Sequence, residues 1–255
     1  MMENNRPLIL VTNDDGVGAK GLEELADVMR LFGNVAVIAP EWPMSGMSGA
    51  ISYDKPLRVS MLKKDDDIVV YKCNGTPVDC IKMGFNHLLG RRPDFVVSGI
   101  NHGSNSSASV IYSGTVGAAI EGCMYGVPSI AFSLCNAESD ADFSRAKIWI
   151  ARIFQTVMEL GLMPFTCLNV NIPQGEIKGV EVCRQTAGKW VEELEQRTDP
   201  RQNDYYWLAG NFRNYESNIE GTDIFAIENQ NVAIVPIKVD MTCYESLQQM
   251  HNWKF

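Results

Sequence analysis

Short apolar runs alternate with amphipathic segments in the first part of the chain. Residues 8–12 (LILVT) and 35–39 (VAVIA) are apolar and rich in strand-forming residues. Residues 21–32, between them, carry apolar side chains at helical spacing. A strand, a helix and a strand within about 32 residues match one βαβ unit. Such units build parallel sheets that are covered by helices.

The same alternation continues to about residue 170. The pattern predicts strands at residues 67–72, 95–98, 129–133 and 166–170, and helices at residues 78–89, 115–125 and 143–162. Thr76-Pro77 precedes the first of these helices, and proline is favoured in a first helical turn. We therefore predict an α/β fold with a mostly parallel sheet and helices on both of its faces.

The pattern changes after about residue 175. Strands are predicted at residues 180–184 and 232–237, and a polar, aromatic-rich stretch covers residues 189–228. Because a structureless loop of that length is uncommon in a compact domain, we predict β-hairpins that form a lobe or an oligomer contact. The sequence lacks internal repeats and Gly/Ser linkers, so we predict one domain over residues 1–255. Its core would cover about residues 1–175, and a β-rich elaboration with the C-terminal segment about residues 176–255.

Charge and cysteine content narrow the partners and the compartment. The chain carries 22 Lys and Arg against 31 Asp and Glu, a net charge of −9, which argues against a long nucleic-acid partner. One small phosphate could still bind locally. Residues 1–7 do not resemble a signal peptide, and the chain has no apolar run of about 18 residues. The seven cysteines are odd in number and form no C-x-x-C pair. We therefore expect reduced thiols in the cytoplasm and no membrane partner.

Two adjacent carboxylates follow the first predicted strand. Asp14 and Asp15 lie in the segment Asn13-Asp14-Asp15-Gly16. In open α/β sheets, ligands bind at the carboxyl ends of the strands. A hard divalent cation such as Mg²⁺ or Mn²⁺ would offset the two like charges. An ordinary turn is the alternative, because Asn, Asp and Gly are turn formers.

Three further segments place Gly and small polar residues at predicted strand ends or before a helix. They are residues 45–49 (SGMSG), 98–105 (SGINHGSN) and 112–115 (YSGT). Backbone N–H groups in such turns, and at a helix N-terminus, can bind a phosphate. Each segment taken alone could be an ordinary turn or N-cap. Their location on the strand ends of one predicted sheet favours an anion site.

Other chemically suggestive residues have simpler interpretations. His102 could act as a general acid, but a solvent-facing loop histidine is the simpler expectation. We expect the aromatic cluster Tyr205-Tyr206-Trp207 to pack rather than to stack on a nucleobase. The charged run at residues 63–67 is expected to be a solvated hairpin turn.

Four segments resemble the survival protein SurE family of metal-dependent 5′/3′-nucleotidases. They are VTNDDG, APEWPMSGMSGAIS, NGTPVDC and PDFVVSGINHGSNSSASVIYSGTVGAAIEG. The resemblance continues through residues 199–208 and 221–223, so it spans nearly the whole chain. It implies a Rossmann-like fold whose hairpin and C-terminal extension serve homodimer or homotetramer assembly. It also implies phosphomonoester hydrolysis of nucleoside 5′- and 3′-monophosphates, with short polyphosphate as a further candidate substrate.

The resemblance also implies individual roles. One divalent cation, Mg²⁺ or Mn²⁺ with Ca²⁺ as a possible substitute in crystals, would be held by Asp14, Asp15, Ser45 and Asn101. Asn105, Ser113, Gly114 and Thr115 would form the phosphate pocket, and Asn13 and Gly16 would position the acidic pair. Asp14, Asn101 and Ser113 are the catalytic candidates. Met44 stands where many relatives carry Arg, which leaves substrate preference open.

Several mechanisms and functions remain as alternatives. Water could attack the phosphorus with Asp14 as orienting base, or Asp14 could form a covalent aspartyl-phosphate. Haloacid-dehalogenase phosphatases use D-x-D rather than adjacent acids, receiver domains are about half as long, and the chain has no G-x-S-x-G elbow. A non-catalytic nucleotide or sugar-phosphate sensor is the alternative from another functional class.

Overall fold

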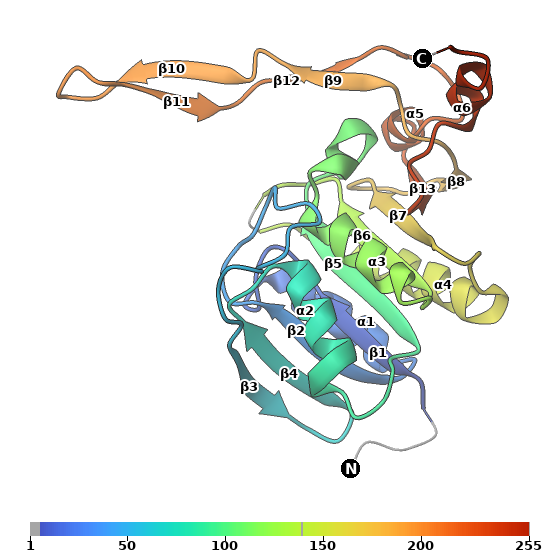
Figure 1. Ribbon diagram of the computed structural model, residues 1–255. Helices are drawn as coiled ribbons and strands as arrows, with labels where there is room; N and C mark the ends of the chain where they lie inside the picture. The colour runs from blue at the N-terminus through green and yellow to red at the C-terminus, as the bar shows by residue number, and fades with distance from the viewer. Residues whose placement is uncertain (1–5, 139, 255) are drawn as a thin grey trace.

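A nine-stranded sheet forms the middle layer of the protein, and Figure 1 shows it in the computed structural model, which describes residues 6–138 and 140–254. The strand order is β3-β4-β2-β1-β5-β6-β7-β13-β8. These strands are Val59–Lys64 (β3), Ile68–Cys73 (β4), Asn34–Pro40 (β2), Leu8–Thr12 (β1), Phe95–His102 (β5), Ser129–Leu134 (β6), Thr166–Ile172 (β7), Asn231–Lys238 (β13) and Gly179–Val182 (β8). Pairing is parallel from β4 to β7 and antiparallel at β3–β4 and β7–β13. The predicted mostly parallel α/β fold is therefore confirmed.

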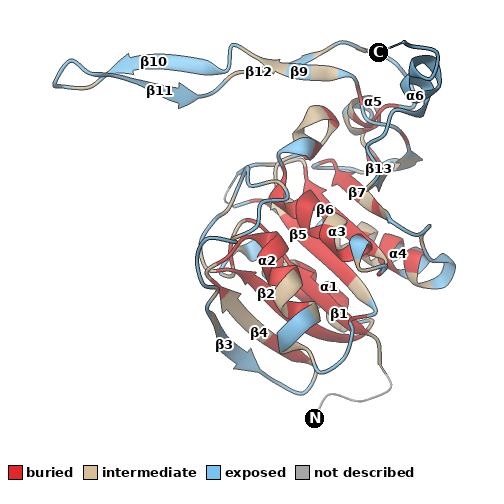
Figure 2. Ribbon diagram, in the orientation of Figure 1, coloured by how far each residue is buried: buried red, intermediate tan, exposed pale blue. Residues whose placement is uncertain are grey.

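Helices cover both faces of the sheet because successive strand residues point to opposite sides. Ile9 and Val11 pack in one core with α1 (Lys20–Arg30) and α4 (Ser144–Leu160). Leu10, between them, packs in another core with α2 (Pro77–Met83). On the same face as α2 lies α3 (Gly114–Met124), which contacts α2, β5 and β6. Figure 2 shows that the central strands are buried between these layers.

The direction of chain progression through the sheet reverses at β1. This strand pairs with β2 on one side and with β5 on the other. In doubly wound sheets, such a reversal opens a crevice at the carboxyl ends of the two diverging strands. The segment that follows β1 and the end of β5 therefore meet at the place where this fold class binds ligands.

A two-part β arm projects from the sheet (Figure 1). Its base pairs Gly188–Val191 (β9) with Asn211–Asn214 (β12), and its outer part pairs Leu194–Thr198 (β10) with Asp204–Leu208 (β11). The predicted hairpins within residues 189–228 are confirmed, although that stretch also contains the helix α5 (Asp223–Glu228). The division into one core and one elaboration stays a prediction.

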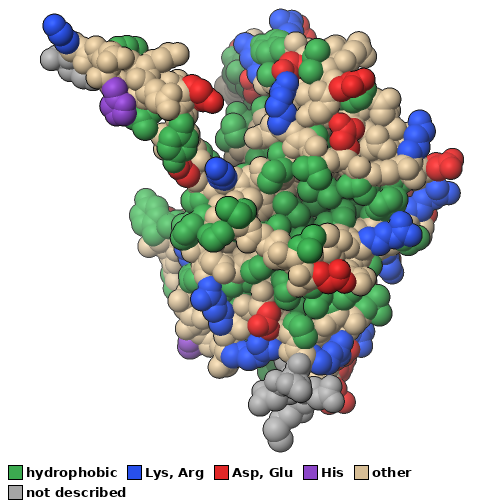
Figure 3. Space-filling model, turned by 90° about the vertical axis from the view of Figure 1, so that its right-hand side faces the viewer, with side chains coloured by type: hydrophobic (Ala, Val, Ile, Leu, Met, Phe, Trp, Pro, Cys, Tyr) green, Lys and Arg blue, Asp and Glu red, His purple; other side chains and the backbone are tan. Residues whose placement is uncertain are grey.

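Apolar surface remains on the side that lies at the right in Figure 1, as Figure 3 shows. There the edge strand β8 leaves Val180 and Val182 exposed. The short helix α6 (Tyr244–Met250), which the sequence pattern did not predict, has no buried residue. None of the helices formed by the described residues is long and apolar enough to cross a membrane.

Two local predictions change in the structure, and one further element appears. The strand predicted at residues 95–98 continues to His102 as β5, with a register shift against β6 between Ser98 and Asn101. The helix predicted at residues 78–89 ends as α2 at Met83 and continues as a π-helical segment over Gly84–Leu88. The segment at residues 107–111 forms a 3-10 turn before α3. The charged run at residues 63–67 does turn between β3 and β4, as predicted.

Candidate active site

The acidic pair lies in a tight turn directly after β1. Asn13 is fully buried, and its Nδ2 donates to the carbonyl oxygen of Gly16 at 3.0 Å. Gly16 has a φ of +100°, in the left-handed region that a residue with a Cβ avoids. The turn therefore needs both residues, and it places Asp14 and Asp15 at the mouth of the crevice.

Asp14 is a buried carboxylate with one strong local partner. Its side chain is 3 % exposed, and its Oδ1 accepts a hydrogen bond from the Thr115 hydroxyl. Burial raises the pKa of Asp14, the Thr115 hydrogen bond opposes that shift, and the neighbouring charge of Asp15 adds to it. A positive charge beside Asp14 would shift its pKa in the opposite direction.

The end of β5 forms the second wall of the crevice. Asn101 Nδ2 donates to the carbonyl oxygen of Gly103 at 2.8 Å, which fixes the orientation of the amide. Asn101 Oδ1 then lies 3.4 Å from the Thr115 hydroxyl, the same group that binds Asp14. A residue of α3 thus brings together an oxygen from β5 and an oxygen from the turn after β1.

His102 is not the solvent-facing loop residue that we expected. It is the last residue of β5, and its side chain is 18 % exposed. Its Nδ1 lies 3.4 Å from Asp15 Oδ2, and its backbone N–H donates to the same oxygen at 3.3 Å. The rings of His102 and Phe143 pack edge to face, with their centroids 5.2 Å apart. The strand extension, which turns His102 toward the acidic pair, is the reason for the difference.

The segment after β2 closes another side of the site. Ser45 and Gly46 line the cleft, while the backbone N–H of Met44 donates to the carbonyl oxygen of Asp14 at 2.7 Å. Ser48 ties this segment to the residues before α3 by donating from its hydroxyl to the Ile111 carbonyl at 2.7 Å. The Met44 side chain lines a separate cavity of about 160 Å³. Met44 is not among the described residues that line the cleft.

The N-terminus of α3 lies against the acidic pair. Ser113 is the N-cap, and its hydroxyl accepts from the backbone N–H of Val116 at 3.1 Å. Ser113 also lines the cleft, whereas Gly114 and Thr115 are not among the described residues that line it. A Cβ on Gly114 would lie 2.9 Å from the Cβ of Asp14. Gly114 and Thr115 thus lie against Asp14, and their part in the phosphate pocket stays a prediction.

Asn105 is held by side chains that sequence reasoning did not identify. Its backbone N–H donates to Asn171 Oδ1 at 2.8 Å, and its Nδ2 donates to the Ser133 hydroxyl at 2.9 Å. Asn169 Nδ2 donates to the Asn105 carbonyl at 2.8 Å. Both partner asparagines are fully buried in β7. The sequence signal that could have identified these partners is a pair of asparagines, two residues apart, in a largely apolar strand.

A single cleft connects these residues to the β arm. Its volume is about 590 Å³, and its lining includes every predicted cation ligand together with Asn105 and Ser113. From the arm it is lined by Trp190, Glu193 and residues 208–210. The expected aromatic residues, Tyr205 to Trp207, are exposed on β11 and are not among the described residues that line the cleft. The prediction that these aromatic side chains pack is therefore wrong within this chain.

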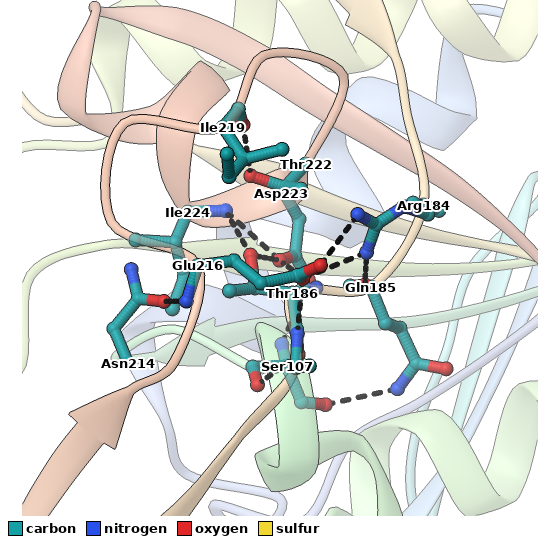
Figure 4. A network of polar contacts seen from close by, with 11 residues as sticks. Ser107, Arg184, Gln185, Thr186, Asn214, Glu216, Ile219, Thr222, Asp223 and Ile224 are labelled. Carbon is teal, nitrogen blue, oxygen red and sulfur yellow. Dashed lines mark hydrogen bonds and ion pairs between the residues drawn. The ribbon is translucent and has the colours of Figure 1, made fainter.

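A buried carboxylate joins the arm to the polar side of the cleft (Figure 4). Asp223 is fully buried and accepts from the backbone N–H of Ser107 at 2.7 Å and from that of Thr186 at 2.9 Å. The Ser107 hydroxyl donates to the Thr186 carbonyl at 2.6 Å. Glu216, just beyond β12, accepts from the backbone N–H of Ala187 at 2.7 Å, and its pKa is lowered to about 2, chiefly by its hydrogen bond with Arg184. These hydrogen bonds thus fix the base of the arm to the rest of the protein.

The donors around the acidic pair fit a hard divalent cation. Asp14, Asp15, Ser45 and Asn101 offer carboxylate, hydroxyl and amide oxygens to one cleft. Mg²⁺ and Mn²⁺ prefer such ligands, whereas zinc sites use His and Cys. Across residues 6–138 and 140–254, no cluster of three or more His, Cys, Asp and Glu side chains is placed to hold a metal ion. Two of the four donor residues, Ser45 and Asn101, would offer neutral oxygens to a cation.

Comparison with known proteins agrees with the fold. The sequence model of the family described as survival protein SurE matches residues 9–192. A protein of Bacteroides fragilis named 5′-nucleotidase SurE is 49 % identical over 99 % of this chain and 100 % of its own length. A protein of Phocaeicola vulgatus with the same name is 47 % identical over 99 % of this chain and 98 % of its own length. The crystal structure of the SurE protein from Aquifex aeolicus has a TM-score of 0.81 at 35 % identity and covers 96 % of this chain and 98 % of its own. The chain therefore belongs to the survival protein SurE family.

Proposed function

We propose that this protein hydrolyses nucleoside monophosphates, at the 5′ and 3′ positions, to a nucleoside and inorganic phosphate. The observation that carries the proposal is the gathering of Asp14, Asp15 and Asn101 around one cleft of about 590 Å³ at the reversal point of the sheet. That volume lies within the range of small-molecule sites. Relatives that match this chain over nearly their full length bear the name 5′-nucleotidase SurE. Short polyphosphate is a further candidate substrate.

The residues of the cleft divide the chemistry among them. Asp14, Asp15, Ser45 and Asn101 would hold a divalent cation, Mg²⁺ or Mn²⁺. When bound, such a cation neutralises charge on the phosphoryl group and lowers the pKa of water in contact with it.

Residues of the chain itself would bind the phosphate and move the protons. Ser113, at the N-terminus of α3, binds phosphate oxygens together with Asn105. Asp14 orients the attacking water and accepts its proton. His102, held against Asp15, donates a proton to the leaving oxygen.

A substrate panel tests the proposed activity. Phosphate release from nucleoside 5′- and 3′-monophosphates and short polyphosphate is measured at fixed Mg²⁺ and at fixed Mn²⁺, with EDTA as the control. We expect turnover of monophosphates that EDTA abolishes and that added metal restores. Nucleotide binding without any turnover would overturn the enzyme assignment in favour of a sensor.

We propose further that the chain acts as a homodimer or homotetramer through its arm. The outer hairpin of β10 and β11 pairs only with itself among the described strands, and an isolated two-stranded hairpin is marginally stable in water. Tyr206 and Trp207 are adjacent on β11 and therefore point to opposite faces of the hairpin, yet they are 57 % and 58 % exposed. A second copy of the chain would cover such apolar faces.

Molar mass in solution checks the assembly. Light scattering is expected to give a mass of two or four chains for the unmodified protein and a smaller assembly for Trp207→Glu. Trp42→Glu, which changes an exposed tryptophan outside the arm, is the matched control and should leave the mass unchanged. A monomeric unmodified protein, or a Trp207→Glu variant of unchanged mass, would contradict the assignment of the arm.

We place the protein in the cytoplasm. All seven cysteines are free thiols, and five of them are buried. Persistent free thiols are typical of a reducing compartment.

A further inference from the structure

We infer that the inner part of the arm is the nucleoside-binding wall of the cleft and that Trp190 stacks on the nucleobase. This inference rests on the proposed nucleotidase function, because it assigns the part of the substrate that the phosphate and cation residues leave free. It makes Trp190 a specificity-determining residue.

The two sides of the cleft differ in chemistry. The sheet side presents carboxylates, amides and hydroxyls, which suit a cation and a phosphate. The arm side presents an indole ring together with Leu208, Ala209 and Gly210. A phosphate with its cation occupies only a small part of about 590 Å³, so the remaining volume faces a wall that is largely apolar. A planar base is the apolar part of a nucleotide.

Trp190 is oriented by its own partner across the arm. It is paired in register with Phe212 of β12, and the two rings meet edge-on, with centroids 5.9 Å apart and an angle of 75°. The pair leaves part of the indole free, because Trp190 remains only partly buried while lining the cleft. Stacking of a base on an exposed aromatic face is favourable and tolerates different bases.

The charges of the cleft favour an uncharged nucleoside over further phosphate groups on this side. The described residues that line the cleft include no Lys or Arg, and the arm contributes the carboxylate of Glu193. A carboxylate repels additional phosphates but accepts hydrogen bonds from ribose hydroxyls and base N–H groups. The arm side thus suits a nucleoside monophosphate better than a polyphosphate chain.

The wall is held at a set distance from the phosphate residues. Asp223 joins Ser107, two residues beyond Asn105, to Thr186, four residues before Trp190 (Figure 4). Within the arm, the backbone N–H of Ala209 donates to the Glu193 carbonyl at 2.8 Å, which keeps the two strands of the wall together. Trp190 is therefore held in a fixed position relative to the proposed phosphate-binding residues.

Paired substrates test the role of Trp190. We would compare a nucleoside 5′-monophosphate with ribose 5-phosphate, which lacks the base, for the unmodified protein, Trp190→Ala and Trp190→Phe. Trp190→Ala should raise KM for the nucleotide by about tenfold and leave that for ribose 5-phosphate unchanged, with kcat little altered. Trp190→Phe should recover much of the loss. Lys189→Ala, adjacent on β9 and exposed, is the matched control that should behave like the unmodified protein.

The outcomes separate this inference from the function on which it rests. An equal effect of Trp190→Ala on both substrates, or an unchanged KM for the nucleotide, would overturn the role of Trp190 while leaving the nucleotidase intact. If the unmodified protein hydrolyses neither substrate, the proposed function fails. Equilibrium binding of the nucleotide to the same variants then decides the stacking role, which requires weaker binding to Trp190→Ala and near-normal binding to Trp190→Phe.

Discussion

Asp14→Asn is expected to lower kcat/KM for nucleoside monophosphates by about 10³-fold. The substitution removes the negative charge of a proposed cation ligand, which is also the base proposed to accept the proton of the attacking water. The amide keeps the shape of the carboxylate, and its oxygen can still accept the hydrogen bond from Thr115. The loss would therefore come from chemistry and not from misplacement of the turn.

The fold should tolerate this variant well. Asp14 is a 3 % exposed carboxylate adjacent to Asp15, so its neutral replacement removes a desolvated charge and a like-charge repulsion. Thermal unfolding in EDTA should occur at the same temperature as in the unmodified protein or above it. Asp66→Asn, in the exposed turn after β3, is the control that should retain full activity. An Asp14→Asn variant with near-normal turnover would remove Asp14 from the proposed chemistry.

Gly114→Ala is expected to lower kcat/KM by about 100-fold without unfolding the protein. The new Cβ would lie 2.9 Å from Asp14 Cβ and 3.0 Å from Asp14 Oδ2, with Pro77 Cγ at 3.3 Å on another side. Asp14 or the first turn of α3 must then shift. Gly114 has no positive φ, and alanine is a better helix former than glycine, so the backbone itself accepts the change.

The measurement compares activity with Mn²⁺ affinity and thermal unfolding. We expect Gly114→Ala to bind Mn²⁺ more weakly, because the displaced carboxylate is one of its proposed ligands. Gly18→Ala is the matched control: this glycine lies four residues after Asp14, and a Cβ there would meet no atom within 4 Å. Normal activity and metal affinity in Gly114→Ala would show that the tight contact does not govern the position of Asp14.

The sequence pattern was a good guide to the elements that carry local signals. The apolar runs at β1, β2, β6 and β7 and the amphipathic repeat of α1 predicted their own boundaries closely. The pattern failed where tertiary contacts override local preference. It ended β5 at Ser98, because Gly99 and the polar residues after it are typical of a loop, yet the strand continues beside β6 to His102.

The candidate site was predictable as a set of segments but not as a geometry. Asp14, Ser45 and Asn101 stand in motifs that single them out, and the structure does bring them to one cleft. The roles of Gly114 and Asn171 were not visible, because they depend on which side chain lies opposite in space. The contribution of Trp190 was hidden for the same reason, since any of several arm aromatics could have faced the cleft.

The sequence by itself determined the fold class, the family resemblance and the polar strand ends that supply the candidate chemistry. These follow from side-chain periodicity and short motifs, which act over a few residues. Only the tertiary structure decided that Thr115 bridges Asp14 and Asn101, that His102 turns toward Asp15, and that the arm closes the cleft. Each of these contacts joins residues distant along the chain, and parallel pairing through crossover connections brings such residues together.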